Sequence, residues 1–365
     1  MSKRILFDHQ KFSTQRYGGI SRYFSNIIQS IKQTGDFDYT LGVLASNCHY
    51  IQNEHQPLNK FGNYLKNPSL AYKINKAYCE HLLKKDAFDI FHPTYYDPYF
   101  LDKVKKPVVV TIHDMTYERL PEYFWAHDNL TNQKRLNIER ADKIIAISET
   151  TKKDLLKYSN VDPAKVEVIY HGIPIEGELI MAPVPNLPEN YVLFVGDRGG
   201  YKNFSLFMNA YKALAKKYPD IKAVITGGGT LGIAETELIY RLKLTGQVMH
   251  YNVTDEQLNF LYNKALAFVY PSLCEGFGLP ILEAFKANCP IILSDTDCFE
   301  EIGAQAALFF NKYEWEDLFT KMDKLVNSAT LRSELITKGT TRLADFPLEK
   351  SIQETFAVYQ KLLPA

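Results

Sequence analysis

Two glutamates, Glu275 and Glu283, stand eight residues apart around a glycine loop in the stretch "YPSLCEGFGLPILEAF". The apolar run before the loop indicates a strand, and Pro280 favours the first turn of a helix, where its missing N–H would be unpaired anyway. The N–H groups of residues 276–279 can hold an anion, and the two carboxylates can accept hydrogen bonds from vicinal diols. The stretch predicts a site for a ligand with phosphates and sugars. A solvated loop glutamate beside a charged first helical turn is the structural alternative.

A second group of candidate binding residues lies in the stretch "VGDRGGYKNF", where a strand is followed by a glycine turn with two cations. Arg198 can pair with a phosphate through two hydrogen bonds, and Lys202 can act as a point charge, so the turn suits a diphosphate. The alternative is a pair of solvated surface cations, which is common for a lone arginine and lysine.

Two further stretches place polar or glycine residues at the ends of strands. In "VVVTIHDMTY", His113 and Asp114 end a run of β-branched residues, and a histidine there either is a satisfied structural group or binds a substrate hydroxyl. In "QRYGGISRYF", Gly18 and Gly19 precede a helix whose N-terminal N–H groups can face an anion. A flexible strand-to-helix turn is the alternative for the glycine pair.

These stretches belong to a repeated alternation of strands and helices. The first half contains the strand-like runs "RILFD", "YTLGVLA", "DIFHP", "PVVVTIHD", "KIIAIS" and "KVEVIYHGI", with helical stretches between several of them. Residues 176–190 are rich in proline and lack apolar periodicity, which is typical of a linker. The alternation restarts at "YVLFVGDRGG" and continues through "IKAVITGGG", "GQVMHYNV", "ALAFVYP", "CPIILSD" and "ALFF".

The pattern predicts an α/β protein with two doubly wound, Rossmann-like domains. We expect an N-terminal, acceptor-side domain over residues 1–175 and a donor-binding domain over residues 191–345, facing each other across a deep cleft. Residues 346–365 indicate an amphipathic helix that can dock on either domain and is grouped with the first.

Composition excludes several classes of protein. The 42 basic and 42 acidic side chains balance, so charge gives no reason to expect a nucleic-acid partner. The five cysteines are scattered without a Cys-x-x-Cys pair, which predicts reduced thiols and no zinc site. The start "MSKRILFD" lacks the features of a signal peptide, and no apolar run approaches the ~18 residues that span a bilayer. We expect a cytoplasmic protein.

Taken together, the motifs resemble retaining glycosyltransferases of family 4. The stretch "EGFGLPILE" is similar to the Glu-x7-Glu signature of that family, and "GGISRY", "TIHD", "IAISETTKKDL", "VIYHGI", "GGYKN" and "VTDEQLNFLYNKALAFVYPSLCEGFGLPILEA" occur in the family's order. The resemblance implies the GT-B fold and transfer of a hexose, mannose being the first expectation, from a GDP- or UDP-type sugar nucleotide. The acceptor would be a hydroxyl of a glycan or lipid-linked glycan in bacterial surface polysaccharide or lipopolysaccharide synthesis, and no metal or other cofactor would be needed.

The resemblance also implies roles for individual residues of the second domain. Lys202 would hold the donor diphosphate, Glu275 the hydroxyl groups of the donor sugar, and Glu283 the ribose. The backbone that would contact sugar and phosphate belongs to Gly276, Phe277, Gly278 and Leu279. Val253 lies in the loop expected beside the base.

In the first domain, the resemblance implies that His113 faces the donor sugar and that Gly18 and Gly19 face its diphosphate. One departure concerns the second domain. Many family members have an arginine directly after the glycine that aligns with Gly196, whereas Asp197 occupies that place in this chain. Arg198 is therefore the candidate for the missing guanidinium group and joins Lys202, Glu275 and His113 as a candidate catalytic residue.

Other motifs support rival functions. Residues 227–232, "GGGTLG", match the Gly-x-Gly-x-x-Gly fingerprint of an NAD-dependent dehydrogenase, with Asp255 at roughly the expected ~20-residue spacing. However, Asp255 belongs to "VTDEQL", which indicates the start of a helix. The Asp-x-Asp triplets at 36–38 and 295–297 are similar to a metal motif of other glycosyltransferases, but turn residues are the better interpretation of both.

Two more rivals share the architecture. A GT-B sugar-nucleotide epimerase or phosphorylase would have the same domains, and a non-enzymatic partner of another transferase would lack Lys202 or Glu275.

Residues 58–85 carry six lysines and one acidic residue, with aromatic side chains between them. Such a segment suits the headgroups of an anionic membrane, where a lipid-linked acceptor would be presented and the protein would bind peripherally. An ordinary solvated helix whose aromatic side chains pack inward is the alternative.

Overall fold

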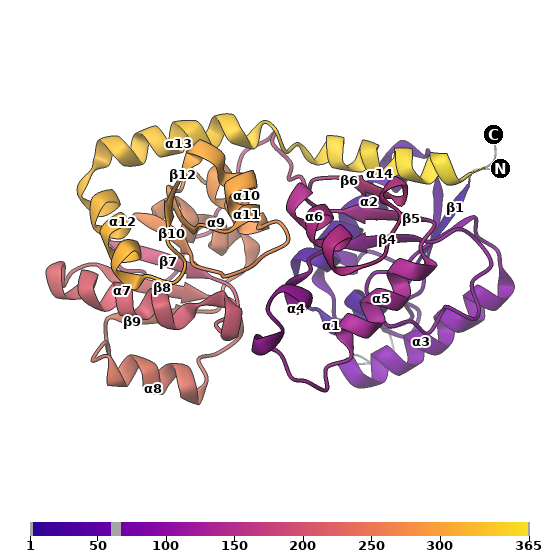
Figure 1. Cartoon of the computed structure of the whole chain (residues 1–365), viewed down its shortest axis with the longest axis horizontal. Coiled ribbons are helices and arrows are strands. Elements are labelled where there is room, and N and C mark those ends of the chain that lie inside the picture. The colour runs from indigo at the N-terminus through magenta and orange to yellow at the C-terminus, as the bar shows by residue number, and fades with distance from the viewer. Residues whose placement is uncertain (1–2, 60–66, 364–365) are drawn as a thin grey trace. The chain divides into compact units, whose positions relative to one another are not determined.

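The computed structural model describes residues 3–59 and 67–363, and the chain divides into two compact units (Figure 1). Unit 1 contains Met1–Glu118, Phe124–His171 and Glu349–Ala365, and unit 2 contains Arg119–Tyr123 and Gly172–Leu348. Residues 176–190, which precede the first strand of unit 2, form neither helix nor strand.

Unit 1 is built on two parallel three-stranded sheets with the orders β2-β1-β3 and β4-β5-β6. A parallel bridge between Phe91 and Val108 connects β3 to the start of β4. The central strands are runs of buried apolar residues, as expected for parallel strands with both faces covered. The strands are β1 (Arg4–Phe7), β2 (Asp38–Leu41), β3 (Ile90–His92), β4 (Val109–Ile112), β5 (Lys143–Ala146) and β6 (Val166–Val168).

Helices cover these sheets. The helix expected after Gly18 is α2, whose apolar stripe faces the core and which ends at Gly35 in a left-handed conformation with φ 71°. Helix α6 begins after Ser148, whose side chain accepts a hydrogen bond from the Thr151 N–H. The helices are α1 (Gln10–Thr14), α2 (Gly19–Thr34), α3 (Pro68–Lys85), α4 (Thr116–Arg119), α5 (Leu130–Arg140) and α6 (Glu149–Tyr158).

The last helix, α14 (Leu348–Leu362), packs on unit 1. The rings of Phe356 and Tyr359 lie 5.2 and 5.6 Å from that of Phe37, and the Tyr359 hydroxyl is 2.8 Å from Nδ1 of His92. The C-terminal helix is therefore anchored in the core of unit 1.

Unit 2 contains one parallel six-stranded sheet with the order β12-β11-β10-β7-β8-β9. The chain runs from β7 outward to β9 and then resumes at β10 on the other side of β7, so the strand order reverses between β7 and β10. In open α/β sheets, ligands bind at the carboxyl ends of strands beside such a reversal. The strands are β7 (Tyr191–Val195), β8 (Lys222–Thr226), β9 (Val248–Tyr251), β10 (Ala267–Tyr270), β11 (Ile291–Ser294) and β12 (Ala307–Phe310).

The core of unit 2 is formed by apolar side chains of the sheet and of α7 and α12, including Phe194, Phe207, Val269 and Leu318. The helices are α7 (Phe204–Lys217), α8 (Ile233–Arg241), α9 (Asp255–Lys264), α10 (Leu279–Lys286), α11 (Asp297–Gly303), α12 (Trp315–Asn327) and α13 (Ala329–Leu343). The predicted α/β organisation with parallel, doubly wound sheets is confirmed, since each predicted strand-like run contains one strand.

All five cysteines are buried and carry free thiols. Over the two described ranges, each helix is either too short or too polar to cross a bilayer.

Candidate functional site

Lys202 and Glu275 meet at the reversal of strand order in unit 2. Lys202 ends a short 3₁₀ helix (Gly200–Lys202) after β7, and Glu275 follows β10, the strand paired with β7. The Nζ of Lys202 lies 2.6 Å from Oε1 of Glu275, and the two side chains are only 17% and 14% exposed. Lys202, predicted to bind the diphosphate, and Glu275, predicted to bind the sugar, therefore form one half-buried ion pair.

Two tyrosines surround this pair. The Nζ of Lys202 lies 5.1 Å from the ring centroid of Tyr201 and 5.9 Å from that of Tyr270, within the range of cation–π attraction. Burial raises the pKa of Tyr270 far above its usual range, and the neighbouring Glu275 carboxylate adds to the shift. The sequence pattern identified Tyr270 only as the end of a strand, because nothing in a strand sequence tells which terminal side chain meets the ligand loop.

The charge state of Lys202 follows from these neighbours. Burial by itself lowers the pKa of the lysine, but the charge of Glu275, the nearby Tyr201 and the hydrogen bond to Glu275 outweigh burial and raise the pKa. Lys202 is therefore a cation throughout the physiological pH range.

The loop after Glu275 presents backbone rather than side chains. Gly278 has φ 93°, and a Cβ there would lie 3.0 Å from the side chain of Ile281 and 3.1 Å from that of Phe299, so only glycine fits. Phe277 is 2% exposed and packs against Phe346 with ring centroids 5.8 Å apart. Among the residues predicted to contact the donor, Phe277 therefore offers its backbone, and Leu279 begins α10.

Glu283 lies on α10, and one of its carboxylate oxygens accepts a hydrogen bond of 3.4 Å from the Tyr262 hydroxyl. Val253 lies in the loop between β9 and α9, half-buried at the carboxyl edge of the same sheet. The structure thus places Lys202, Glu275, Glu283 and Val253 at one edge of unit 2, which is the edge where open α/β sheets bind ligands.

Arg198 has a different environment from the one expected for a diphosphate ligand. Its side chain is 2% exposed, its Nε donates to Oε1 of Glu235 at 2.9 Å, and its Nη1 donates to the carbonyl of Gly227. Its Nη2 lies 3.0 Å from the carbonyl oxygens of Gly228, Gly229 and Thr230. In the structure, the donors of Arg198 serve the glycine loop after β8 instead of an open phosphate site.

That loop is "GGGTLG", the motif behind the dehydrogenase alternative. Gly227, Gly228 and Gly229 have φ values of 84°, 64° and 72°, a left-handed turn that brings their carbonyls to Arg198. Asp255 begins helix α9 after the N-cap Thr254, as expected. The loop is therefore a partner of the β7 loop, and Asp255 is not at a strand end where a ribose would be bound.

His113 lies in unit 1, directly after β4. It is 6% exposed, its backbone N–H donates to the Tyr96 hydroxyl at 3.0 Å, and its ring Nε2 is buried with no hydrogen-bond partner in the part of the chain that the structure describes. Burial holds the pKa of His113 well below its usual range, and the neighbouring His171 lowers it further. A neutral imidazole with an unused nitrogen can bind a hydroxyl group.

Gly18 and Gly19 lie at the start of α2 in the same unit. Gly18 is the N-cap residue in extended backbone, and a Cβ on it would lie 2.6 Å from the side chain of Gln15. The first turn of α2 contains no acidic residue, so no nearby carboxylate would repel an anion bound at the N–H groups of this helix start.

The Asp-x-Asp triplets have structural partners. Asp36 lies in the bend after Gly35, whereas Asp38 begins β2 and pairs with Arg4. Asp295 follows β11 and accepts a hydrogen bond of 3.0 Å from the Lys312 N–H. Within residues 3–59 and 67–363, no group of three or more His, Cys, Asp or Glu side chains is arranged to hold a metal ion.

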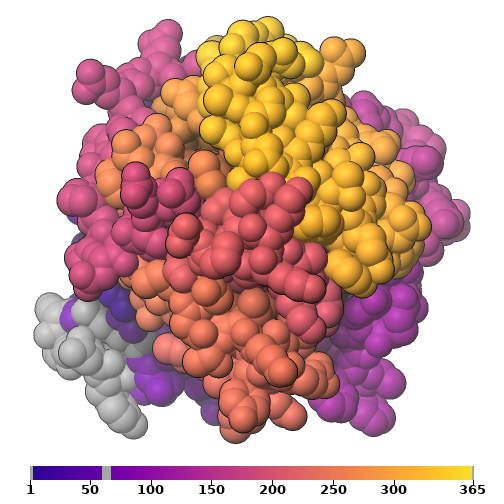
Figure 2. All heavy atoms as spheres, turned by 90° about the vertical axis from the view of Figure 1, so that its left-hand side faces the viewer, coloured from indigo at the N-terminus to yellow at the C-terminus, as the bar shows by residue number. Residues whose placement is uncertain are grey.

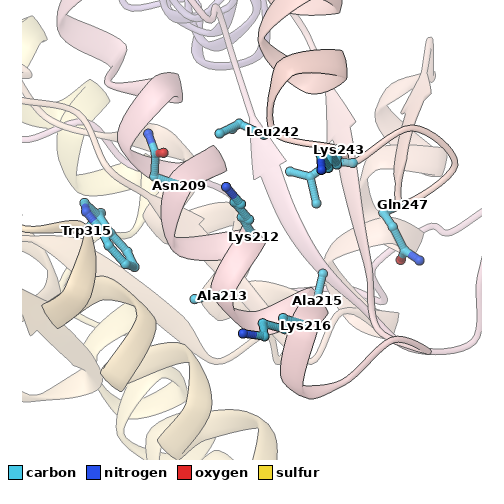
Figure 3. Close-up of a pocket in the computed structure, with 10 residues that line it drawn as sticks. Asn209, Lys212, Ala213, Ala215, Lys216, Leu242, Lys243, Gln247 and Trp315 are labelled. Carbon is cyan, nitrogen blue, oxygen red and sulfur yellow. The ribbon is translucent and has the colours of Figure 1, made fainter.

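A separate groove of about 540 Å³ lies on unit 2, between α7, the turn after α8 and the start of α12 (Figure 3). Figure 2 shows the molecular surface from the side of unit 2 on which α7 lies in Figure 1. Lys212, Lys216 and Lys243 line the groove together with Trp315. None of the predicted site residues belongs to it, and Gln247 in its wall precedes β9, so this part of the groove lies at the opposite edge of the sheet from Glu275.

Comparison with known proteins identifies the family. A model described as "Glycosyltransferase Family 4" matches residues 17–176, and one described as "Glycosyl transferases group 1" matches residues 178–342. The chain belongs to glycosyltransferase family 4. The family predicted from the motifs is thereby confirmed across both units.

Among curated relatives of this family 4 chain, the O-antigen chain mannosyltransferase RfbU of Salmonella typhimurium is 29% identical over 59% of this chain and 61% of its own. The chain therefore matches less than two thirds of that relative's length. The O-antigen chain mannosyltransferase B of Escherichia coli is 25% identical over 75% of this chain and 74% of its own.

Solved structures with a similar fold cover nearly the whole chain. Sucrose-phosphate synthase from Thermosynechococcus elongatus has a TM-score of 0.76 at 17% identity, covering 99% of both chains. Anabaena HepE in complex with UDP-glucose has a TM-score of 0.75 at 15% identity, covering 99% of this chain and all of its own. The predicted GT-B fold is confirmed.

Proposed function

We propose that the protein is a retaining, metal-independent glycosyltransferase that moves a hexose from a nucleoside-diphosphate sugar to a hydroxyl of a glycan or lipid-linked glycan. The observation that carries the proposal is the Lys202–Glu275 pair at the strand reversal of unit 2. A fixed cation beside a carboxylate, next to a glycine loop that starts a helix, suits a ligand with a diphosphate and a sugar.

Unit 2 would bind the donor and unit 1 the acceptor. Lys202 would hold the diphosphate, Glu275 the sugar hydroxyls and Glu283 the ribose, with the backbone of residues 276–279 between them. In unit 1, the neutral His113 would bind a hydroxyl of the donor sugar, and the start of α2 at Gly18 and Gly19 would face the diphosphate.

In the proposed reaction, the acceptor oxygen bonds to the anomeric carbon on the face from which the diphosphate leaves. The bond between that carbon and the β-phosphate oxygen breaks, and the leaving phosphate takes the acceptor proton. Lys202 stabilises the negative charge that develops on the phosphate. Because the pKa of Lys202 is raised, the lysine acts as a permanent charge and not as a proton donor.

Mannose is the first donor sugar to test, because two relatives are named as O-antigen mannosyltransferases. The same names suggest a role in bacterial lipopolysaccharide synthesis. Nucleotide sugars of this kind are made in the cytoplasm, where the five free thiols would stay reduced, so we place the protein there, peripheral to the membrane at most.

The test is a panel of GDP-mannose, UDP-glucose and UDP-N-acetylglucosamine. A donor that binds the folded state raises the melting temperature, and the best donor is then offered with methyl α-mannoside as acceptor. We expect release of the nucleoside diphosphate and an α-linked product by NMR, unchanged in excess EDTA. A β-linked product would reject retention, and loss of activity in EDTA that Mg²⁺ restores would reject metal independence. A new sugar nucleotide formed without acceptor would instead indicate the epimerase.

A further inference from the structure

Lys11 is a half-buried lysine that none of the predicted roles includes. It lies in α1, directly after β1, with its Nζ 3.4 Å from the ring centroid of Tyr95. The described residues give it no carboxylate within ion-pair distance. Burial lowers the pKa of Lys11 to about 8, and the charge of Asp114 opposes that shift only in part. An ammonium group that lies over a ring without a carboxylate partner retains hydrogen-bond donors that are not used by protein acceptors.

A buried network fixes the position of Lys11. The Lys11 N–H donates to Oγ1 of Thr94 at 3.1 Å, and that hydroxyl donates to Oδ1 of Asp8 at 2.6 Å. Asp8 is fully buried, and the side-chain amide of Gln10 donates both to Asp8 and to the carbonyl of Tyr95. Both the lysine backbone and the ring beneath its Nζ are therefore held before any ligand binds, as in a preorganised binding site.

The charge that acts on Lys11 is that of Asp114, which follows β4 and has ionic partners of its own. Asp114 is 41% exposed, accepts from the Thr116 N–H at 2.9 Å and lies 4.0 Å from Nζ of the buried Lys134. Lys134 in turn pairs with Glu118 at 2.9 Å. His113 precedes Asp114, and its Nε2 has no partner within the described ranges. After burial and His171, the charge of Lys11 also lowers the pKa of His113. The cations and carboxylates balance, so the surroundings do not favour an anion.

We propose that Lys11 and Asp114 form a subsite for the hydroxyl groups of a neutral acceptor sugar, beside His113. The lysine donates to one sugar oxygen and the carboxylate accepts from a neighbouring hydroxyl. A polyol offers both a donor and an acceptor at vicinal positions, whereas a phosphate or carboxylate ligand would meet Asp114 and Glu118 as like charges. This inference rests on the proposed transfer reaction and adds residues that bind its second substrate.

The first test measures KM for donor and acceptor separately, with methyl α-mannoside as the acceptor probe, in Lys11→Met, Lys11→Arg and the control Lys153→Met. Lys153 is an exposed lysine of α6 in the same unit. Loss of a charge-assisted hydrogen bond predicts an acceptor KM raised about 10- to 100-fold in Lys11→Met, with the donor KM changed less than about twofold. Lys11→Arg retains most of the affinity, and Lys153→Met changes neither constant.

The pH dependence separates a binding role from a packing role. In the native protein the acceptor KM rises above about pH 8 as the ammonium group loses its proton. Lys11→Arg removes this rise because a guanidinium stays charged, and Lys11→Met shows a high KM without it. An acceptor KM that Lys11→Met leaves unchanged at every pH would show that Lys11 only covers Tyr95. A donor KM that rises instead, or both constants rising with a lower melting temperature, would also overturn the subsite.

A second measurement does not need transfer and so separates this inference from the proposed function. The Nζ signal of Lys11, assigned with Lys11→Arg, is followed by NMR during titration with methyl α-mannoside and with inorganic pyrophosphate. A saturable shift with the mannoside that Asp114→Asn weakens supports the subsite, even if no donor is turned over. A shift with pyrophosphate alone, or none with either probe, contradicts it.

Discussion

Lys202 and Glu275 are 73 residues apart in the chain, and their side chains meet because β7 and β10 are hydrogen-bonded neighbours. One strand delivers the cation and the other the carboxylate to the same edge of the sheet. The ion pair therefore depends on strand order, and a different order would separate Lys202 from Glu275.

Removing either member of this pair should abolish transfer without unfolding the protein. Lys202→Ala and Glu275→Ala each delete a charged group that acts on the transition state, a loss on the order of 10²- to 10³-fold in kcat. Glu275→Ala also leaves a half-buried cation unpaired, so its melting temperature should fall more than that of Glu275→Gln.

The control for this prediction is Lys217→Ala, which breaks the exposed pair with Asp323 (2.7 Å) in the same unit. Exposed pairs are screened by water and contribute little to stability, so activity and melting temperature should stay near those of the native protein. Near-normal turnover in both Lys202→Ala and Glu275→Ala would reject the assignment of the site.

Buried histidines of unit 1 should make the protein acid-sensitive. Burial lowers the pKa of His92 and of His171 to about 3, from an unfolded value near 6.5. The unfolded chain therefore binds protons that the folded chain does not, and stability present above pH 6.5 is lost as the pH falls toward 3. At pH 5 each histidine should contribute a loss of about 2 kcal/mol in the free energy of unfolding.

Urea unfolding at pH 7 and pH 5 measures this loss. In His92→Gln the difference between the two pH values should shrink by about 2 kcal/mol, while the exposed-site control His81→Gln should leave it unchanged. An unaltered pH difference in His92→Gln would mean that His92 is protonated in the folded protein.

Arg198 should act through the loop it holds. Arg198→Met removes donors to the carbonyls of residues 227–230, so amide hydrogen exchange of this loop should increase, with a smaller loss of turnover than in Lys202→Ala. Arg198→Lys should not restore protection, because an ammonium group cannot replace the planar fork. If Arg198→Met abolishes turnover as Lys202→Ala does and exchange is unchanged, the guanidinium serves the ligand after all.

The lysine-rich segment 58–85 should be tested on the residues that remain exposed. Residues 60–66 lie outside the described part of the chain, and Lys76 pairs with Asp97 at 3.0 Å. The exposed lysines of α3 are Lys73, Lys84 and Lys85.

Changing these three lysines to glutamate should weaken binding to vesicles rich in anionic lipid by on the order of 100-fold or more at low salt, measured by flotation. The matched control makes the same charge change at Lys212, Lys216 and Lys243 in the groove of unit 2 (Figure 3). Equal recovery of the native protein and the α3 variant would show that this segment is not a membrane anchor.

Local patterns sufficed for the strands, since each predicted strand-like run contains a strand. They also sufficed for caps such as Ser148 on α6 and Gly35 after α2. The pairing of Lys202 with Glu275 could not be predicted from residue types, because it depends on which strands become neighbours. Resemblance to the family assigned both residues to the donor site but did not predict that their side chains pair.

The environment of Arg198 could not be predicted for a different reason. Its partners are mostly main-chain carbonyls, and because every residue has one, the sequence does not indicate which carbonyls Arg198 contacts. Lys11 was missed similarly, since its unusual pKa arises from burial over Tyr95, a contact between segments separated by more than 80 residues.

The anchoring of α14 has a consequence for how the chain can be shortened. Because Tyr359 and Phe356 complete the core around Phe37 and His92, helix α14 belongs to the same folding unit as the first strands of the chain. Unit 1 cannot finish folding until translation has passed through unit 2. A stop codon between residues 349 and 356 would therefore damage unit 1, while leaving residues 172–348 intact.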